Sequence, residues 1–375
     1  MEKTLDVKLA ALKKDPGSRV FILADARDAD MAFGITSPGQ NPDGSLRSLA
    51  EYREQMRQIV SQGMVDIMLM SASTSEILTI QERIFDASAV TPAVRVNDTT
   101  DLHMIRGSRY AQAPSHPFAT TTIDHIQAGK SPCTEDERRR GTNLGLYSVT
   151  FNNDPERDLK VMEAYKAFRL EAEAKHFSHF LEVFHPNVPG KVHGIAPEEI
   201  PFFVNDHIAR LLAGVTSVGR PRFLKIPYGG PQAMEELCGY DSSLVVGVLG
   251  GSAGTTHDAF ALVYEAKRYG ARAALFGRKI KASEHPLSFV HFLRLVADDQ
   301  ILPAEAVMAY HGTLHALGIT PHRSLDKDLE LTSLDANYEA VGNVSSPAQA
   351  QAAKTRTRQG WGTRFLAGAS RGKYS

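Results

Sequence analysis

Short apolar runs alternate with longer segments of helical periodicity along most of the chain. The runs have the length of strands, are rich in Val, Ile, Leu and Phe, and are bounded by Gly, Pro, Asn or Asp, a pattern typical of buried β-strands. We predict eight strands, at Arg19–Asp25, Val65–Ser71, Thr91–Asn97, Gly145–Phe151, Ser178–Phe184, Pro221–Tyr228, Ser243–Gly250 and Ala273–Gly277.

The segments between these strands carry apolar residues at helical spacing. The clearest helix is predicted within Asp154–Phe177, because Asp154 can cap it and Pro155 suits its first turn. Its expected apolar stripe consists of Leu159, Met162, Tyr165 and Phe168. A second helix follows the seventh strand and is expected to stop at Gly270.

The regular alternation of strands and helices favours a parallel sheet, because parallel neighbours need a helical crossover. A closed (β/α)8 TIM barrel of the α/β class fits eight such strands in a chain of 375 residues. An open doubly wound sheet is the alternative, but no G-x-G-x-x-G motif follows the first strand. The closed barrel is therefore the predicted fold.

Two segments fall outside the alternation. The polar stretch Asp98–Gly141 is expected to be an excursion between the third and fourth strands. We predict a barrel catalytic domain over residues 1–320 and a basic C-terminal extension over residues 321–375. This extension is either a partly disordered tail or an arm that packs on a neighbouring subunit through Trp361 and Phe365. We expect a homo-oligomer.

The charge balance narrows the range of partners. With a net charge of −1 and a pI near 6.9, the chain shows no electrostatic signature of nucleic-acid or anionic-membrane binding. Its two cysteines are far apart and lack metal-ligand spacing, which favours free thiols in a reducing compartment. The first residues contain no long apolar run, so we expect neither a signal peptide nor a membrane anchor. A cytoplasmic enzyme is the expected class.

The most unusual position in the predicted strands is Lys225, in the sequence FLKIPY. A lysine that is buried without a partner is costly or gives up its proton. Because side chains alternate, Phe223, Lys225 and Pro227 share one face of the strand. If that face points to the barrel axis, the amine opens onto the end of the barrel where active sites form, and its neutral form attacks carbonyls to give a Schiff base. The alternative is an outward lysine whose head reaches water.

Two carboxylates accompany this lysine. Asp25 ends the first strand in the sequence FILADAR, on the same face as a phenylalanine and a leucine, and Arg27 lies just beyond it. Glu182 stands in HFLEVF between two phenylalanines of its own face, and apolar surroundings favour a carboxyl that exchanges protons near neutrality. Structural roles are the alternatives: Asp25 can cap the next turn, and Glu182 can pair with an arginine or with Lys225.

Glycines follow the seventh and eighth strands, in the sequences VLGGSAG and LFGRK. At these positions of a barrel, glycines let backbone N–H groups approach a phosphate, and Arg278 adds a guanidinium. Glycine is common in tight turns, so this signal gains weight only from its position opposite a lysine on the sixth strand.

Together these motifs resemble the class I, Schiff-base-forming aldolase superfamily, in particular the tagatose-bisphosphate, sulfofructose-phosphate and archaeal-type fructose-bisphosphate aldolases. LADAR is similar to the first-strand Asp-x-Arg of that group, FLEVF to its fifth-strand glutamate, FLKIPY to its lysine strand, and LGG and FGR to its phosphate loops. The resemblance implies that Lys225 forms the Schiff base, that Asp25 assists it and that Glu182 moves protons. The substrate-binding residues that we expect from it are Arg27, His185, Gly250, Gly251, Ser252, Gly277 and Arg278.

The sequence also departs from the group. The tagatose-type enzymes carry an inward lysine on the fourth strand, where this chain offers Tyr147, Ser148 and Thr150. The archaeal type has a tyrosine before a proline after the fifth strand, where this chain has His185 before Pro186. These differences leave open what holds the second charged group of the substrate and whether Glu182 or His185 donates the proton.

The resemblance implies a class I aldolase that splits or forms a phosphorylated ketose, gives dihydroxyacetone phosphate and an aldehyde, and needs no cofactor or metal. A metal-dependent lyase or hydrolase is one alternative, since His185, His193 and His207 cluster around the fifth strand. A non-catalytic sensor of sugar phosphates on the same barrel is another, because a fold does not determine a function.

Overall fold

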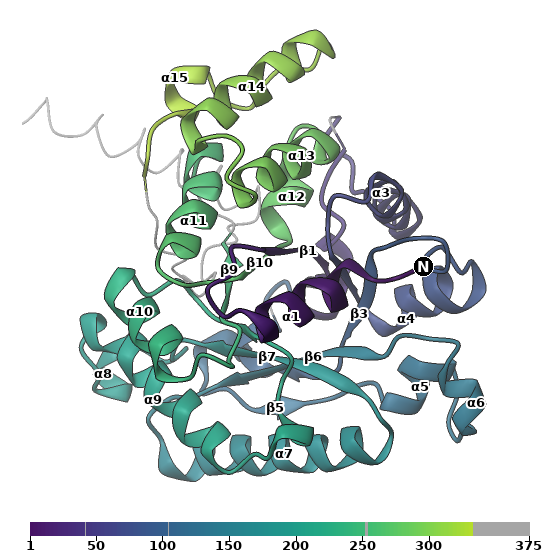
Figure 1. Ribbon diagram of the computed structural model, residues 1–375, viewed down its shortest axis with the longest axis vertical. Coiled ribbons are helices and arrows are strands. Elements are labelled where there is room, and N and C mark those ends of the chain that lie inside the picture. Colours follow the sequence, from purple (N-terminus) through teal and green to yellow (C-terminus); the bar gives the residue numbers. More distant parts are fainter. Residues whose placement is uncertain (42, 104, 252–253, 333–375) are drawn as a thin grey trace, which may run out of the picture. The chain divides into compact units, whose positions relative to one another are not determined.

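The computed structural model describes residues 1–41, 43–103, 105–251 and 254–332. Its main feature is one sheet of eight parallel strands in the order β8-β7-β6-β3-β2-β1-β10-β9 (Figure 1). These strands are β1 (Ile22–Arg27), β2 (Ile67–Met70), β3 (Thr91–Arg95), β6 (Leu144–Thr150), β7 (Ser178–Phe184), β8 (Leu224–Lys225), β9 (Gly247–Gly250) and β10 (Ala273–Phe276). All eight predicted strands are confirmed.

The two strands at the ends of this order also meet. A parallel bridge joins Ile226 to Val248, and the amide of Leu224 donates a hydrogen bond to the carbonyl of Val245 at 2.8 Å. The sheet is therefore closed, which confirms the (β/α)8 barrel and excludes the open doubly wound alternative.

Helices alternate with the strands. They are α1 (Thr4–Lys14), α2 (Asp30–Phe33), α3 (Leu49–Gln62), α4 (Ala72–Ser75), α5 (Ile123–Ala128), α6 (Glu135–Arg138), α7 (Pro155–Ala174), α8 (Gly190–His193), α9 (Ile200–Ala213), α10 (Pro231–Tyr240), α11 (Thr256–Arg268), α12 (Arg278–Ala282), α13 (Pro286–Ala297), α14 (Pro303–Ala316) and α15 (Leu325–Asp328). The predicted stop of α11 is confirmed, since Gly270 follows it with a φ of +109°.

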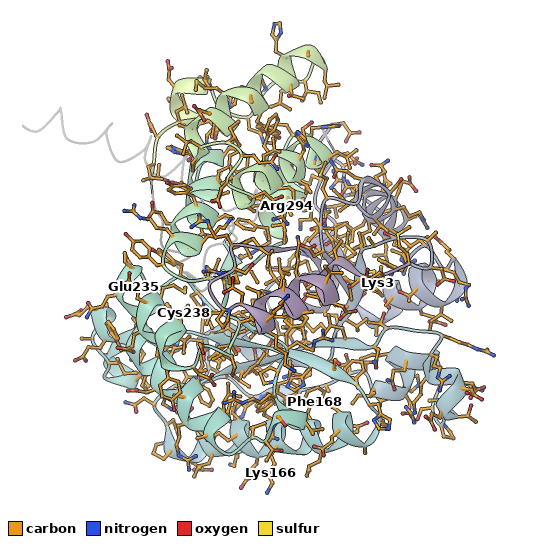
Figure 2. All side chains as sticks on the ribbon, viewed as in Figure 1. Lys3, Lys166, Phe168, Glu235, Cys238 and Arg294 are labelled. Carbon is orange, nitrogen blue, oxygen red and sulfur yellow. The ribbon has the colours of Figure 1, made fainter. Side chains whose placement is uncertain are left out.

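Helix α7 begins as predicted, because the carboxylate of Asp154 accepts a hydrogen bond from the amide of Arg157. The apolar stripe predicted for this helix is wrong at its first residue, Leu159. Leu159 is 59% exposed, and the buried face is made instead by Val161, Tyr165, Phe168 and Ala172. These residues recur at four, three and four positions and so stay on one side of the helix, whereas Leu159 lies about 200° from Val161. Figure 2 shows Phe168 on the strand side of α7 and Lys166 on the opposite side.

The predicted excursion lies between the third and fourth strands of the barrel. It contains a small antiparallel pair, β4 (Asp98–Thr99) with β5 (Pro117–Phe118), followed by α5 and α6. Because the excursion starts just after the C-terminal end of β3, its first residues reach the end of the barrel where the strands finish.

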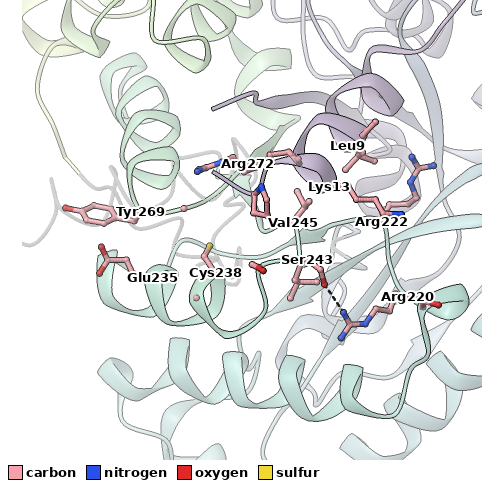
Figure 3. Close-up of a pocket in the computed structure, with 18 of the residues that line it drawn as sticks. Leu9, Lys13, Arg220, Arg222, Glu235, Cys238, Ser243, Val245, Tyr269 and Arg272 are labelled. Carbon is pink, nitrogen blue, oxygen red and sulfur yellow. Dashed lines mark hydrogen bonds between the residues drawn. The ribbon is translucent and has the colours of Figure 1, made fainter. Parts of the chain in front are cut away.

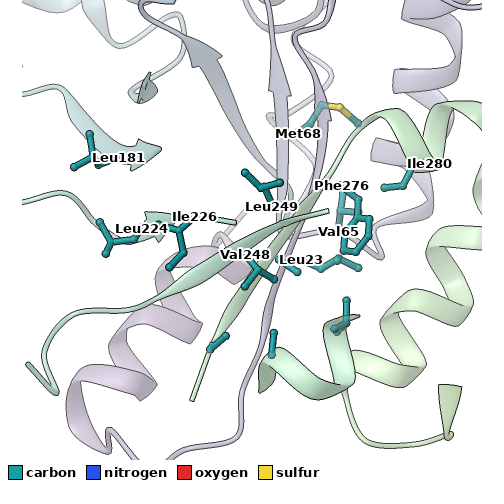
Figure 4. Close-up of a cluster of buried hydrophobic side chains, with 14 of the residues drawn as sticks. Leu23, Val65, Met68, Leu181, Leu224, Ile226, Val248, Leu249, Phe276 and Ile280 are labelled. Carbon is teal, nitrogen blue, oxygen red and sulfur yellow. The ribbon is translucent and has the colours of Figure 1, made fainter. Parts of the chain in front are cut away.

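Apolar side chains fill both faces of the barrel wall. The larger cluster joins the outer faces of the strands to the helices, with Leu181, Leu224 and Val248 from adjacent strands (Figure 4). The smaller cluster lies inside the barrel, and Leu5 and Leu12 of α1 belong to it. Helix α1 therefore covers the N-terminal end of the barrel interior.

The chain after residue 320 is described only in part. Up to Thr332 it packs on the body: the Asp328 carboxylate accepts hydrogen bonds from the amide of Thr256 at 2.8 Å and, with its other oxygen, contacts His311 Nε2 at 2.9 Å. The predicted arm, with Trp361 and Phe365, lies outside the described residues, so the boundary at residue 320 and the homo-oligomer stay predictions. Among the helices that are described, none is long and apolar enough to cross a bilayer.

Candidate active site

The inward faces of the strands change from apolar to charged along the barrel axis. Toward the N-terminal end the interior holds residues such as Ile22, Phe180 and Phe223. Because side chains alternate, the inward residue two positions after Phe180 is Glu182, and the one two positions after Phe223 is Lys225. Both expected inward placements are found, and the charged residues lie where barrel active sites form.

A small cavity of about 90 Å³ opens at this end of the barrel, and Asp28, Arg95, Glu182 and Lys225 line it. Lys225 Nζ lies 2.6 Å from Glu182 Oε1. The two residues are register partners on adjacent strands, which places their side chains at the same level. The side chains are only 8% and 2% exposed, so the amine and the carboxylate face each other almost without water.

Ser148 and Arg95 complete the surroundings of Glu182. The Ser148 hydroxyl donates to Glu182 Oε2 at 2.7 Å, and Arg95 Nη2 donates to the same oxygen at 3.3 Å. Arg95 Nη1 also donates to the Ser148 oxygen at 2.8 Å, while its Nε donates to Asp28 Oδ2 at 2.5 Å. One guanidinium thus links two carboxylates on opposite sides of the cavity, and both oxygens of Glu182 are held in fixed directions.

The electrostatics of this group favour charged side chains despite their burial. Burial raises the pKa of Asp28, but the Arg95 guanidinium and the Lys225 ammonium outweigh it and hold that pKa below its ordinary value. Burial works against the charge of Arg95 as well, yet Asp28, Glu182 and Asp98 raise the pKa of Arg95 above its ordinary value. Arg95 is therefore a permanent cation, and Asp28 is a carboxylate at neutral pH.

Asp98 lies at the edge of the same network. Its Oδ1 is 3.9 Å from Arg95 Nε and has no hydrogen-bond partner among the described residues. Burial raises the pKa of Asp98 to about 6, and Arg95 offsets this only in part. Asp98 therefore gains a proton in the folded protein at a pH where it is still ionised in the unfolded chain.

This titration predicts a pH-dependent gain of stability in an Asp98→Asn variant. A raised folded pKa means that the wild-type side chain contributes stability at low pH and loses it as the pH rises through about 6. The variant is therefore expected to be more stable than the wild type at pH 7.5, by up to about 3 kcal/mol, and equally stable near pH 4. Urea unfolding at both pH values measures the difference. Asp86→Asn, at an exposed carboxylate, is the control and should show no such pH-dependent gain.

Three of the residues predicted to bind phosphate line the same cavity as Lys225. Gly250, Gly277 and Arg278 line it together with Lys225. Both glycines also have a packing reason: a Cβ on Gly250 would lie 2.1 Å from the ring of Phe276, and one on Gly277 would lie 2.1 Å from a backbone oxygen. Gly251 adjoins Gly250 in the chain, and Ser252 lies outside the described residues.

Asp25 and Arg27 do not line the cavity, so the structure does not bring these two predicted site residues together with Lys225. Arg27 Nε donates to both oxygens of Asp25 at 2.8 Å, and its Nη1 donates to Gln55 of α3 at 3.0 Å. Both side chains are fully buried between β1 and the helical layer, where the Arg27 guanidinium lies 5.5 Å from the ring centre of Tyr52. The inward positions of the first strand are the even-numbered ones, and Asp28 is the acid that lines the cavity.

His185 also points away from the barrel axis. It borders a separate small cavity with Asn205 of α9, and burial lowers the pKa of His185 to about 4, so the ring is neutral. His193 Nδ1 accepts a hydrogen bond from the amide of Ile195, and the His207 ring makes a tilted contact with the Phe203 ring within α9. The described part of the chain contains no group of three or more His, Cys, Asp or Glu side chains suited to a metal ion.

Three residues of the network escaped the sequence analysis. Arg95 interrupts an apolar strand just as Lys225 does, so the same criterion would have found it. Asp28 lies three residues beyond the predicted end of the first strand, and Ser148 is predicted only as a difference from the tagatose-type aldolases. No sequence signal shows that Ser148 donates to Glu182, because this requires the register of β6 with β7.

No protein-family model matches the sequence, and no curated protein sequence matches it either. Solved structures do match. A Schiff-base-forming fructose-1,6-bisphosphate aldolase has a TM-score of 0.54 at 16% identity, over 78% of this chain and 100% of that one. The chain has the fold of that aldolase.

Two further structures agree. An archaeal fructose 1,6-bisphosphate aldolase has a TM-score of 0.53 at 17% identity, over 77% of this chain and 98% of that one. A fructose-bisphosphate aldolase from Slackia heliotrinireducens has a TM-score of 0.56 at 14% identity, over 82% and 90%. The resemblance expected from the strand motifs is confirmed at the level of the fold.

Proposed function

We propose that the protein is a class I aldolase that cleaves or forms a phosphorylated ketose through a Schiff base on Lys225. The observation that carries this proposal is the 2.6 Å contact between Lys225 and Glu182 at the C-terminal end of the barrel, in one cavity with Gly277 and Arg278. A nucleophilic amine needs a base to take its proton, and a phosphorylated substrate needs an anion-binding wall.

The first half of the reaction uses the lysine and the glutamate. Glu182 takes a proton from the Lys225 ammonium, and the neutral amine attacks the carbonyl carbon of the ketose. The protonated Glu182 returns its proton to the carbinolamine hydroxyl, which leaves as water and gives the iminium. Ser148 and Arg95 hold Glu182 in place through both changes of charge.

The second half breaks the bond between the third and fourth carbons. A carboxylate takes the proton from the hydroxyl on the fourth carbon, the bonding electrons move to the iminium, and an aldehyde departs from the enamine. Asp28 is the proposed base, since it lines the cavity and stays ionised, whereas Asp25 does not line the cavity. Protonation and hydrolysis of the enamine release dihydroxyacetone phosphate and restore Lys225.

Gly250, Gly251, Gly277 and Arg278 are the proposed phosphate contacts. A further cation lies close by, since Lys281 of α12 is surrounded by Arg27, Arg278 and Arg47. Burial, followed by these three guanidinium groups, lowers the pKa of Lys281 to about 8. An anion bound beside Arg278 would relieve this repulsion, which supports an anionic group of the substrate on this side of the cavity.

Reductive trapping tests the proposal directly. The protein is incubated with dihydroxyacetone phosphate or candidate ketose phosphates and then with borohydride, and the modified peptide is found by mass spectrometry. A stable adduct on Lys225 is the expected result, and EDTA should leave both the adduct and the turnover unchanged. No adduct with any of these substrates, or an adduct on another lysine, contradicts the proposal. Turnover that EDTA abolishes would point to the metal-dependent alternative, and binding without turnover to the sensor.

A further inference from the structure

A second, larger cavity lies at the opposite end of the barrel. Its volume is about 1010 Å³, above the range of most small-molecule sites. It is bounded by α1, by α10 and by the segments that lead into β8, β9 and β10. It shares no lining residue with the cavity around Lys225, so it is separate from the proposed catalytic site.

The wall of this cavity is strongly basic. Five cationic side chains line it, against the two carboxylates of Asp6 and Glu235 in the lining and that of Asp241, which pairs with Arg220. The cations are Lys13, Arg220, Arg222, Arg268 and Arg272. The whole chain carries a net charge of −1, so this surplus of positive charge is local. Such a concentration attracts anions over several ångströms at physiological salt.

Three of these five cations are held in place by contacts to protein groups. Arg222 Nη2 lies 2.7 Å from Asp6, and Arg220 Nη1 lies 2.7 Å from Asp241. Arg272 Nε donates to the carbonyl of Ser18 at 2.9 Å, and burial lowers the pKa of Arg272 below its ordinary value. The side chains are therefore ordered before a ligand arrives, which reduces the entropy that binding costs.

The two ends of the cavity differ in chemistry. Figure 3 shows Lys13 and Arg222 at one side and Tyr269 with Glu235 at the other. Val245 lies between them, and Leu9, Leu12, Pro16 and Leu244 add further apolar lining. A ligand that fills the cavity would thus place anionic groups at the first side, and a flat ring and hydroxyl groups at the second.

The cavity holds no reactive group of its own. Its thiol, Cys238, is half-buried, and desolvation raises the pKa of Cys238 to about 12, although Arg272 is close. The thiol is therefore neutral and a poor nucleophile at physiological pH. The cavity is suited to binding rather than to catalysis.

We propose that this cavity binds a nucleoside polyphosphate. The phosphates contact Lys13, Arg220 and Arg222, the ribose hydroxyls donate to Glu235, and the base packs on Tyr269. Tyrosine rings stack on nucleobases, and guanidinium groups match phosphate oxygens in pairs.

The bound nucleotide would contact the chain just before β8, the strand that carries Lys225. The Arg222 amide donates to the carbonyl of His179, the second residue of β7, at 2.8 Å, and Arg222 precedes Lys225 by three residues. At about 3.3 Å per residue, the two lie roughly 10 Å apart along the strand. The site is thus placed where a ligand can influence the strand that carries Lys225.

Calorimetric titration of the full-length protein tests the proposal, with ATP, adenosine and inorganic triphosphate as probes at about 0.15 M salt. ATP is expected to bind once per chain, and adenosine and triphosphate at least about tenfold more weakly. A Lys13→Gln/Arg222→Gln variant should weaken ATP binding at least about tenfold. Tyr269→Ala should weaken ATP binding and leave triphosphate binding unchanged.

The control variants make the same kinds of substitution at positions outside the cavity. Lys14→Gln/Arg83→Gln changes two exposed cations outside the lining, and Tyr240→Ala removes a tyrosine that is 65% exposed. Both controls should bind ATP like the wild type. The proposal is overturned if ATP does not bind saturably, if the charge control weakens binding as much as the cavity variant, or if triphosphate binds as tightly as ATP.

Discussion

Replacement of Lys225 by methionine is expected to lower kcat/KM for a ketose phosphate by about 10⁴-fold or more, because the chain then lacks the amine that forms the iminium. Methionine retains a flexible chain of similar length, so the side-chain volume at this buried position is largely preserved. A coupled assay of aldehyde release measures the change, and borohydride trapping should give no adduct.

Stability is not expected to fall in parallel. Glu182 keeps the hydrogen bonds from Ser148 and Arg95 in this variant, so its carboxylate is not left without a partner. Circular dichroism should therefore show a folded protein. Lys160→Met, which removes an exposed lysine of α7, is the matched control and should keep full activity. A Lys225→Met enzyme with more than about a tenth of the wild-type rate would refute the Schiff-base mechanism.

The fold could be predicted from the sequence because its signal is local. Each strand is a short apolar run between helical segments, and parallel strands separated by helices have few ways to pack. The closure itself could not be derived, since it depends on the single bridge between Ile226 and Val248 and its hydrogen bonds. The barrel followed from the number of strands, not from any residue of β8 or β9.

The site could be predicted only where one face of a strand was distinctive. Glu182 lies two positions after Phe180 and Lys225 two positions after Phe223, and both phenylalanines fill the barrel, so alternation placed the two charged residues correctly. The first strand is buried on both faces, and each face carries an acid. Nothing local distinguishes Asp25 from Asp28 under these conditions.

Contacts between residues that are far apart in the sequence could not be predicted from the sequence. Arg95 and Glu182 are 87 positions apart, and the excursion separates their strands in the chain. The sequence shows that both residues interrupt apolar strands, but only the order and register of β3, β6 and β7 bring them together. The most consequential pairing in the site is therefore tertiary in origin.

Replacement of Arg95 by methionine is expected to destabilise the protein by about 3–5 kcal/mol at pH 7, because Asp28 loses its main counter-ion and Glu182 loses one of its donors inside a site with little water. Arg57→Met is the control at a partly exposed pair on α3 and should cost at most about 1 kcal/mol. Urea unfolding of the three proteins at pH 7 measures both effects.

The pH dependence of this loss identifies its cause. In the wild type the pKa of Asp28 is lowered, so Asp28 contributes stability above its unfolded pKa that is lost as the pH falls. Without Arg95 burial dominates and the folded pKa rises, which reverses the sign: stability is then lost as the pH increases. The gap between the two proteins should therefore narrow toward pH 4. Addition of Asp28→Asn to the Arg95→Met variant should recover about 1–2 kcal/mol at pH 7, since it removes the unpaired charge. A gap that stays constant with pH, or no recovery in the double variant, would show that Arg95 acts through packing and not through its charge.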